Sequence, residues 1–247
     1  QAVEFAHRVS MGSAVFNKFT LIEKNEALYS SIFRHYKKLK KGTSLNDRYL
    51  LTMALQNFPW LDNEETDLAA NFLELAKQGH PGAMFEYGYL LLRKQENIPE
   101  AVKWIGLASS YGLARAEYRL GKLLTTSPWV ELDEQKALFW FESAAQKDHV
   151  AAALKAAELK LQTTNKSILD IDGAVNLLKQ IADKQQSNPE YFYVLALSHR
   201  YRENRDFTQV VKNLEKAILM GSNINWDVSE WQNLLSTLTE GKVYITE

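Results

Sequence analysis

Apolar residues recur three and four positions apart along most of the chain, which is the spacing that gathers side chains on one face of an α-helix. The periodic stretches are short, roughly twelve residues each, and turn-forming residues separate them. No segment keeps the apolar–polar alternation of a half-buried strand over a useful length. The pattern therefore predicts an all-α chain built from many short amphipathic helices.

The helical pattern is itself repeated. The segment AVKWIGLASSYG begins at Ala101, and ALFWFESAAQKD begins 36 residues later at Ala137. Further copies begin at Leu68, Ala174 and Val210. A second helical segment precedes the copies, beginning at Ala83, Ala116, Ala152 and, in a weaker form, Tyr191. About five successive two-helix units are predicted, with a period typical of helical solenoids.

Residues with a preference for helix ends occur at matching places in these units. Acidic or amide residues precede the second helix at Glu64, Asn97, Asp133, Asp170 and Asp206. Their side-chain oxygens can accept a hydrogen bond from a free N–H group of the first helical turn. Glycines close the second helix at Gly79, Gly112 and Gly221, where a left-handed backbone is favoured.

The two ends of the chain depart from the repeat. We expect an N-terminal helical cap over residues 1–42, with helices over 3–20 and 25–41. The repeats then occupy residues 43–221, and a capping helix over 226–238 with a tail completes residues 222–247. Such end pieces cover the last apolar face of a stack of repeats. No Gly/Ser-rich or Pro-rich linker divides the chain into independent domains.

Composition narrows the classes of function. The 247 residues carry a net charge of −1, so nucleic-acid binding, which favours a basic excess, is not expected. The chain has no cysteine, which excludes disulfides, thiolate zinc sites and cysteine nucleophiles. No apolar run approaches the ~18 residues of a membrane span, and no signal peptide is visible. We therefore predict no transmembrane segment in this chain.

Residue types that carry catalysis are sparse. None of the five histidines has a partner at metal-ligand spacing, and His80 and His149 occupy equivalent repeat positions, which favours a structural role. Neither a nucleophile elbow nor a glycine-rich phosphate loop is present. The acidic runs 62–65 and 131–134 stand at helix starts, where they complement the helix dipole. We expect no enzyme, no metal and no cofactor.

The tryptophans divide into two groups. Trp104 and Trp140 share one repeat position, which predicts a place in the core. Trp60 and Trp129 follow prolines in turns and are candidates for exposed aromatic contacts. Burial of these two rings beneath their turns is the alternative.

The central units resemble the Sel1-like repeat, a relative of the tetratricopeptide repeat. One unit carries the resemblance at Ala116, Leu120, Gly121, Asp133, Lys136, Ala137, Trp140, Ala144 and Ala145. The preceding unit carries it at Ala83, Tyr87, Gly88, Ala101, Trp104, Ala108 and Gly112. The resemblance implies a right-handed α-solenoid of stacked antiparallel helix pairs that serves as a non-catalytic protein or peptide interaction scaffold.

A bacterial adaptor in envelope, secretion or signalling assembly is the function that the resemblance implies. A glycan- or small-molecule-binding envelope component or sensor is the alternative. Many bacterial members of the family are exported, so a periplasmic or secreted location is suspected, and a cytoplasmic one is also compatible with the sequence.

The first helices of such a solenoid usually line its concave face. Helical spacing then directs these side chains toward a partner: Phe85, Tyr89, Arg93, Arg115, Tyr118, Lys122, Tyr193, Arg200 and Tyr201. Tyrosine and arginine are enriched among the residues that dominate binding energy, and the basic members favour an acidic protein or peptide. An ordinary solvated helix surface with partly packed tyrosines is the alternative.

Overall fold

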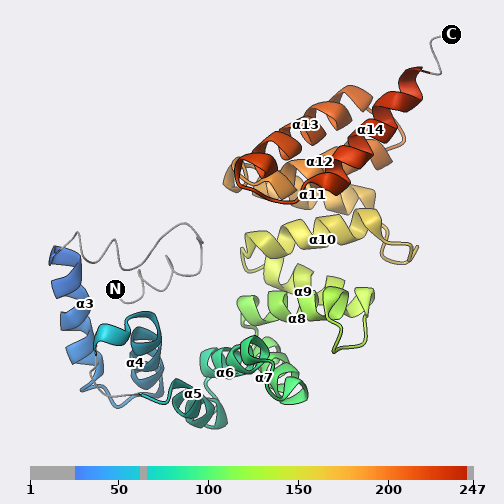
Figure 1. Ribbon diagram of the computed structural model, residues 1–247. Helices are drawn as coiled ribbons and strands as arrows, with labels where there is room; N and C mark the ends of the chain where they lie inside the picture. The colour runs from blue at the N-terminus through green and yellow to red at the C-terminus, as the bar shows by residue number, and fades with distance from the viewer. Residues whose placement is uncertain (1–25, 62–65, 244–247) are drawn as a thin grey trace. The chain divides into compact units, whose positions relative to one another are not determined.

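The computed structural model describes residues 26–61 and 66–243 (Figure 1). These residues form twelve α-helices and two 3₁₀ turns, with no strand among them. The all-helical prediction is thereby confirmed. The chain falls into two compact units, residues 1–116 and 117–247.

In the first unit, helices that are neighbours in sequence pack against one another, and the same order is seen in Figure 1. Its elements are α3 (Glu26–Leu39), α4 (Leu45–Asn57), η1 (Pro59–Leu61), α5 (Leu68–Lys77), α6 (Pro81–Lys94) and α7 (Ile98–Ser110). The predicted helix over 25–41 is confirmed as α3, whereas the one predicted over 3–20 lies outside the described residues.

Helix α8 (Ala114–Thr126) begins at the end of the first unit and supplies the first helix of the second. The elements that follow are α9 (Glu134–Ala145), α10 (Val150–Gln162), α11 (Ile171–Ile181), η2 (Ala182–Lys184), α12 (Pro189–Tyr201), α13 (Phe207–Asn223) and α14 (Ser229–Val243). Each repeat thus has a first helix (α4, α6, α8, α10 and α12) and a second helix (α5, α7, α9, α11 and α13). Among the described residues, no helix has the length and apolar character that a bilayer crossing requires.

Side-chain caps fix where the second helices begin. The predicted caps Asn97, Asp133, Asp170 and Asp206 are confirmed, since each accepts a hydrogen bond from the backbone N–H three residues later. Helix α5 is capped in the same way by Asp67, and Glu64 lies outside the described residues. A cap of this kind contributes about 1 kcal/mol to helix stability.

The helix ends show one wrong prediction. Gly79 and Gly112 end their helices with φ of +91° and +78°, as expected of left-handed residues. Gly221 instead lies inside α13, and a Cβ atom there would stand 2.6 Å from Cγ1 of Val228. Helix α13 continues for two residues beyond Gly221, so this glycine does not end the helix. It is needed because the segment leading into α14 passes close to its backbone.

Small residues set the distance between first and second helices. A Cβ atom on Gly88 of α6 would lie 2.8 Å from the carbonyl oxygen of Ala101 in α7. At the equivalent Gly121 of α8, it would lie 2.6 Å from the ring of Phe141 in α9. The recurring small residues Ala108, Ala144 and Ala217 are fully buried on the second helices. Backbones therefore approach closely at the same place in successive repeats.

Trp104 and Trp140 do occupy equivalent places, but the prediction that they lie in the core is wrong. Both are only partly buried, whereas Ile105 and Phe141, the next positions along, are fully buried. Trp104 packs edge-on against Tyr87 at 6.1 Å, and Trp140 packs edge-on against its exposed neighbour Phe139 at 5.0 Å. The indole ring thus covers the rim of the helix pair, and the position beside it fills the interior.

Candidate ligand-binding site on the first helices

One position of the first helix carries a large apolar or aromatic side chain in every repeat. The position is occupied by Tyr49, Phe85, Tyr118, Leu154 and Tyr193, spaced 36, 33, 36 and 39 residues apart. Tyr49 stacks on His80 with ring centroids 4.2 Å apart, and Tyr118 stacks on His149 at 4.7 Å. Tyr193 stacks on Trp231 of α14 at 5.2 Å. These side chains therefore hold successive elements together.

The two histidines in this arrangement are helix caps. Nδ1 of His80 accepts a hydrogen bond from the N–H of Ala83, and Nδ1 of His149 accepts one from the N–H of Ala152, both at 3.2 Å. Burial lowers the pKa of both imidazoles, and the Arg115 charge lowers that of His80 further. Each imidazole is thus kept neutral, which leaves Nδ1 able to accept. The structural role expected from their repeat equivalence is confirmed.

Arg115 is tied to the interior of the first unit. Its Nη1 lies 2.7 Å from Oε1 of Glu86, which is 5% exposed, and its Nη2 donates to Oη of Tyr49 at 2.6 Å. The guanidinium also lies over the Phe85 ring, 4.7 Å from its centroid. Burial raises the pKa of Glu86, while the Arg115 charge acts in the opposite direction. The guanidinium therefore joins α6 to α8 and compensates a buried carboxylate.

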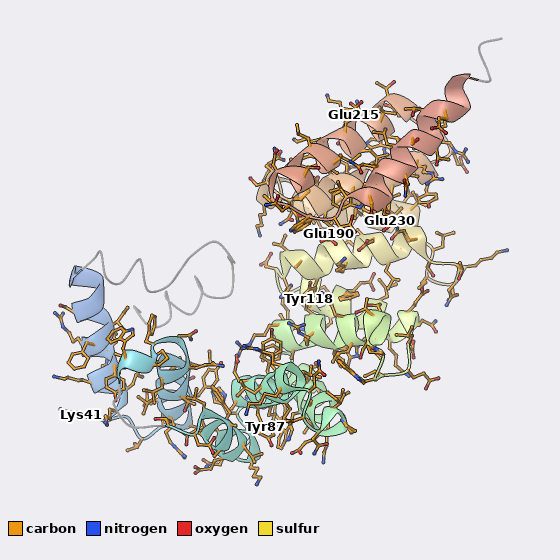
Figure 2. The ribbon with its side chains drawn as sticks, in the orientation of Figure 1. Lys41, Tyr87, Tyr118, Glu190, Glu215 and Glu230 are labelled. Carbon is orange, nitrogen blue, oxygen red and sulfur yellow. The ribbon has the colours of Figure 1, made fainter. Side chains whose placement is uncertain are left out.

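The equivalent positions in the second unit hold the reverse charges. Lys155 of α10 occupies the place of Glu86, and Glu190 of α12 occupies the place of Arg115. Nζ of Lys155 lies 2.5 Å from Oε1 of Glu190 and 2.7 Å from Oε2 of Glu158. Burial opposes the charge of Lys155, but these two carboxylates outweigh it and raise its pKa. Figure 2 shows Glu190 on α12 and Tyr118 on α8 among the side chains of this unit.

A pocket of about 430 Å³ lies between α8, α9 and α10, entirely within the second unit. Its apolar lining comes from Leu124, Leu132, Phe141 and Leu159. Its polar lining comes from Lys122, Thr125, Thr126, Glu134, Lys155, Glu158 and Gln162. Ligand pockets in proteins typically fall between about 300 and 1,000 Å³ and combine an apolar wall with a few polar groups.

Lys122 differs from the other ionised groups in this lining. Lys155 and Glu158 pair with each other, and Glu134 accepts a hydrogen bond from Oγ1 of Thr163 at 2.6 Å. Within the described part of the chain, Nζ of Lys122 makes neither a hydrogen bond nor an ion pair. Burial and the positive charges of Arg119 and Lys155 lower the pKa of Lys122, and the carboxylates of Glu190 and Glu158 counter this only in part. An anion placed beside this ammonium group would relieve that repulsion.

The remaining residues of the predicted contact set differ in exposure. Phe85 and Tyr193 are only 5% exposed, and Tyr89 is partly buried and stacks on Phe85 at 5.7 Å. Arg93 is exposed, and the guanidinium of the partly exposed Arg200 lies 5.6 Å from the centroid of the exposed Tyr201 ring. The structure brings Phe85, Tyr89 and Arg115 together in the first unit and places Tyr118 and Lys122 on α8 of the second.

Sequence reasoning did not identify several groups that shape this surface. They are Tyr49, Glu86, Lys155, Glu158 and Gln162. A usable signal existed, because Glu86, Arg119 and Lys155 occupy one repeat position and all three are charged. Each of these charges stands at the same place on its own first helix, so the charged position was visible in the repeat alignment.

The two turn tryptophans are also separated by the structure. Trp60 is partly buried and packs on Phe58 at 5.9 Å, in the apolar cluster of α3 and α4. Trp129 is 52% exposed, and Leu132 in the same turn is 60% exposed and lines the pocket. Trp129 thus has an exposed aromatic surface and stands three residues before a pocket-lining residue, whereas most of the Trp60 ring packs against its neighbours.

Comparison with known proteins agrees with this architecture. The sequence matches the Sel1 repeat family over residues 81–110 and 114–149. No curated protein is similar enough in sequence to count as a match. A Sel1 repeat protein from Oxalobacter formigenes superposes with a TM-score of 0.57 at 20% identity, covering 75% of this chain and 77% of that one.

A protective antigen present in uropathogenic Escherichia coli strains, which displays an SLR fold, superposes with a TM-score of 0.62 at 16% identity. The match covers 87% of this chain and 48% of the antigen, so this chain spans about half of its length. At these identities the superpositions establish the fold. Together with the two matched repeats, they show that the chain is an α-helical repeat protein that contains Sel1 repeats.

Proposed function

We propose that this chain is a non-catalytic scaffold that binds a protein or peptide through the first helices of its repeats, as an adaptor in a bacterial envelope, secretion or signalling assembly. Sel1 repeats typically mediate protein–protein interaction, which supports the general role. The observation that carries the proposal is the pocket between α8, α9 and α10, because it is preformed and combines four apolar side chains with an unpaired ammonium group.

The surface that we assign to the partner is smaller than the set predicted from sequence. Arg93, Lys122, Arg200 and Tyr201 have side-chain surface to offer, whereas Phe85 and Tyr193 are buried. Arg115 is held by Glu86 within the first unit, and Tyr118 stacks on His149 within the second. Few interface residues dominate binding energy, so a small exposed set is sufficient for specific recognition. The positive charge of its basic members favours an acidic partner.

Charge reversal tests the proposal. The double variant Arg93→Glu with Lys122→Glu changes one exposed or pocket-facing cation in each unit and leaves the Arg115–Glu86 pair intact. In a pull-down from the source bacterium, quantified by mass spectrometry, we expect a specific protein bound by the wild type to be lost.

The matched control is Lys103→Glu with Lys179→Glu, which makes the same charge change on the second helices α7 and α11. Both control lysines are exposed. Equal loss in both variants would indicate nonspecific electrostatic capture, and no loss in the first would contradict the assigned surface. Binding to a glycan array with no captured protein would favour the alternative, a glycan- or small-molecule-binding envelope component.

A further inference from the structure

We propose that the pocket between α8, α9 and α10 is the anchoring subsite for a peptide, and that it takes one apolar side chain together with an adjacent carboxylate bound by Lys122. This inference rests on the function proposed above and adds the chemistry of the ligand. It requires three properties of the pocket: an apolar wall, one available cation and no room for excess negative charge.

The apolar wall comes from three different segments. Leu124 belongs to α8, Phe141 to α9 and Leu159 to α10, and Leu132 adds a wall from the turn before α9. Phe141 is buried, whereas Leu132 is 60% exposed and remains available for contact. Removing one large apolar side chain of a ligand from water strengthens binding roughly ten- to a hundredfold. A pocket of about 430 Å³ is large enough for such a side chain and the polar group beside it.

The charges in the pocket favour a carboxylate. Lys155 is held by Glu158 and Glu190, so Lys122 is the lining cation that makes no ion pair with a described residue. Burial and the positive charges of Arg119 and Lys155 lower the pKa of Lys122, and the attraction of Glu190 and Glu158 offsets this only in part. A ligand carboxylate would supply the missing negative charge and form a charge-assisted hydrogen bond.

The two glutamates that line the pocket argue against a more highly charged ligand. Glu134 and Glu158 both face it, so a phosphate group with a charge near −2 would meet repulsion that a single carboxylate largely avoids. Trp129, three residues before Leu132, offers an exposed ring for the flanking part of a peptide. The ligand is therefore a peptide segment in which Asp or Glu neighbours a large apolar residue.

A phage-displayed library of random twelve-residue peptides is the probe. The immobilised baits are the wild-type chain, Lys122→Met and the control Lys179→Met, which removes an exposed lysine of α11 outside the pocket. We expect the wild type and the control to enrich peptides with an acidic residue beside Leu, Ile, Phe or Met. Lys122→Met should enrich apolar residues without the acidic neighbour.

Titrations of the enriched peptides by fluorescence anisotropy supply the quantitative test. Loss of the ammonium group should weaken binding at least about tenfold, and replacing the peptide carboxylate by its amide should weaken wild-type binding to a similar extent. The amide peptide should bind Lys122→Met no more weakly than the acidic one. Circular dichroism establishes that each variant is folded.

The outcomes separate the two proposals. Enriched peptides that bind Lys122→Met as tightly as wild type would overturn the subsite while leaving the scaffold function standing. Enrichment of no peptide by the wild type would count against the scaffold function itself, and the subsite would fall with it. If Lys122→Met does not fold, labelling of the wild-type Lys122 amine with an acylating reagent decides the question. Bound peptide should protect that amine selectively, and unchanged labelling would refute the proposal.

Discussion

The two compact units place opposite charges at the same pair of repeat positions. In the first unit, Glu86 of α6 faces Arg115 of α8, and in the second, Lys155 of α10 faces Glu190 of α12. The first pair is nearly buried and includes the Tyr49 hydroxyl, whereas the side chains of the second pair are about a quarter exposed. Equivalent positions in the repeats therefore preserve geometry and allow the sign of the charge to change.

The difference in exposure has a consequence for function. In the first unit the cation Arg115 forms an ion pair with the buried carboxylate of Glu86, and this pair links two helices. In the second unit Lys155 links the helices, and Lys122 on the pocket wall makes no ion pair with a described residue. A solenoid can thus use one set of positions to hold its helices together and still leave a pocket between neighbouring repeats, which is the binding site that we propose.

The largest expected effect comes from removing the cation of each pair. Arg115→Met leaves Glu86 buried without its partner, which should lower the free energy of unfolding by about 3–5 kcal/mol, less whatever protonation of Glu86 recovers. Lys155→Met should cost only about 1 kcal/mol, because Glu158 and Glu190 keep access to water. Urea denaturation followed by circular dichroism measures both.

The double variant Arg115→Met with Glu86→Leu distinguishes a buried charge from a damaged interface. Removing both charges should restore most of the lost stability, since a well-packed apolar pair often replaces a buried ion pair without cost. Equal destabilisation by Arg115→Met and Lys155→Met would break the comparison between the two units.

A second comparison concerns the glycines at which first and second helices touch. Gly88→Ala would place a Cβ atom 2.8 Å from a backbone oxygen, and Gly121→Ala would place one 2.6 Å from the buried Phe141 ring. Each should destabilise its unit by about 1–3 kcal/mol, the usual range for overpacking. Thermal unfolding of the wild type and of each variant measures the loss of stability.

Gly106 provides the matched control, because it lies inside α7 and a Cβ atom there would meet nothing within 4 Å. Gly106→Ala should stabilise the first unit by about 0.5–1 kcal/mol through its higher helix propensity. Destabilisation by all three substitutions would mean that the close approach of the helices is not the reason for glycine at residues 88 and 121.

The sequence predicted most of the fold because its signals are local. Helical periodicity, the caps at Asn97, Asp133, Asp170 and Asp206, and the left-handed Gly79 and Gly112 are all encoded within one or two helical turns. Gly221 was assigned wrongly because the same residue type serves both a helix end and a close helix contact. Trp104 and Trp140 were assigned wrongly because a shared repeat position fixes equivalence and does not fix depth.

The candidate site was predictable only in part, for a different physical reason. Spacing on the first helices selected Lys122, which does line the pocket, and also Phe85 and Tyr193, which are buried. Whether an arginine or lysine is available depends on carboxylates about 30 residues away, as Glu86 is from Arg115. Pairing across helices is a tertiary property, so the periodicity of one helix cannot reveal it.

The last predicted effect is a dependence of stability on pH, which we expect in both units. Nδ1 of His80 and of His149 must be unprotonated to cap α6 and α10, and both pKa values are lowered in the folded state. The unfolded chain therefore binds more protons, so stability is complete above the ordinary histidine pKa of about 6.5 and falls as the pH drops below it.

Replacing both histidines by asparagine, the residue that caps the equivalent helix α12 at Asn188, should keep the caps and remove the titration. We expect wild type to lose about 1 kcal/mol per cap relative to this double variant between pH 7.5 and about 5, measured by urea denaturation. Because Glu86 and the other carboxylates are common to both proteins, their titration cancels in the difference, and parallel pH profiles would show that neither imidazole is held neutral by its cap.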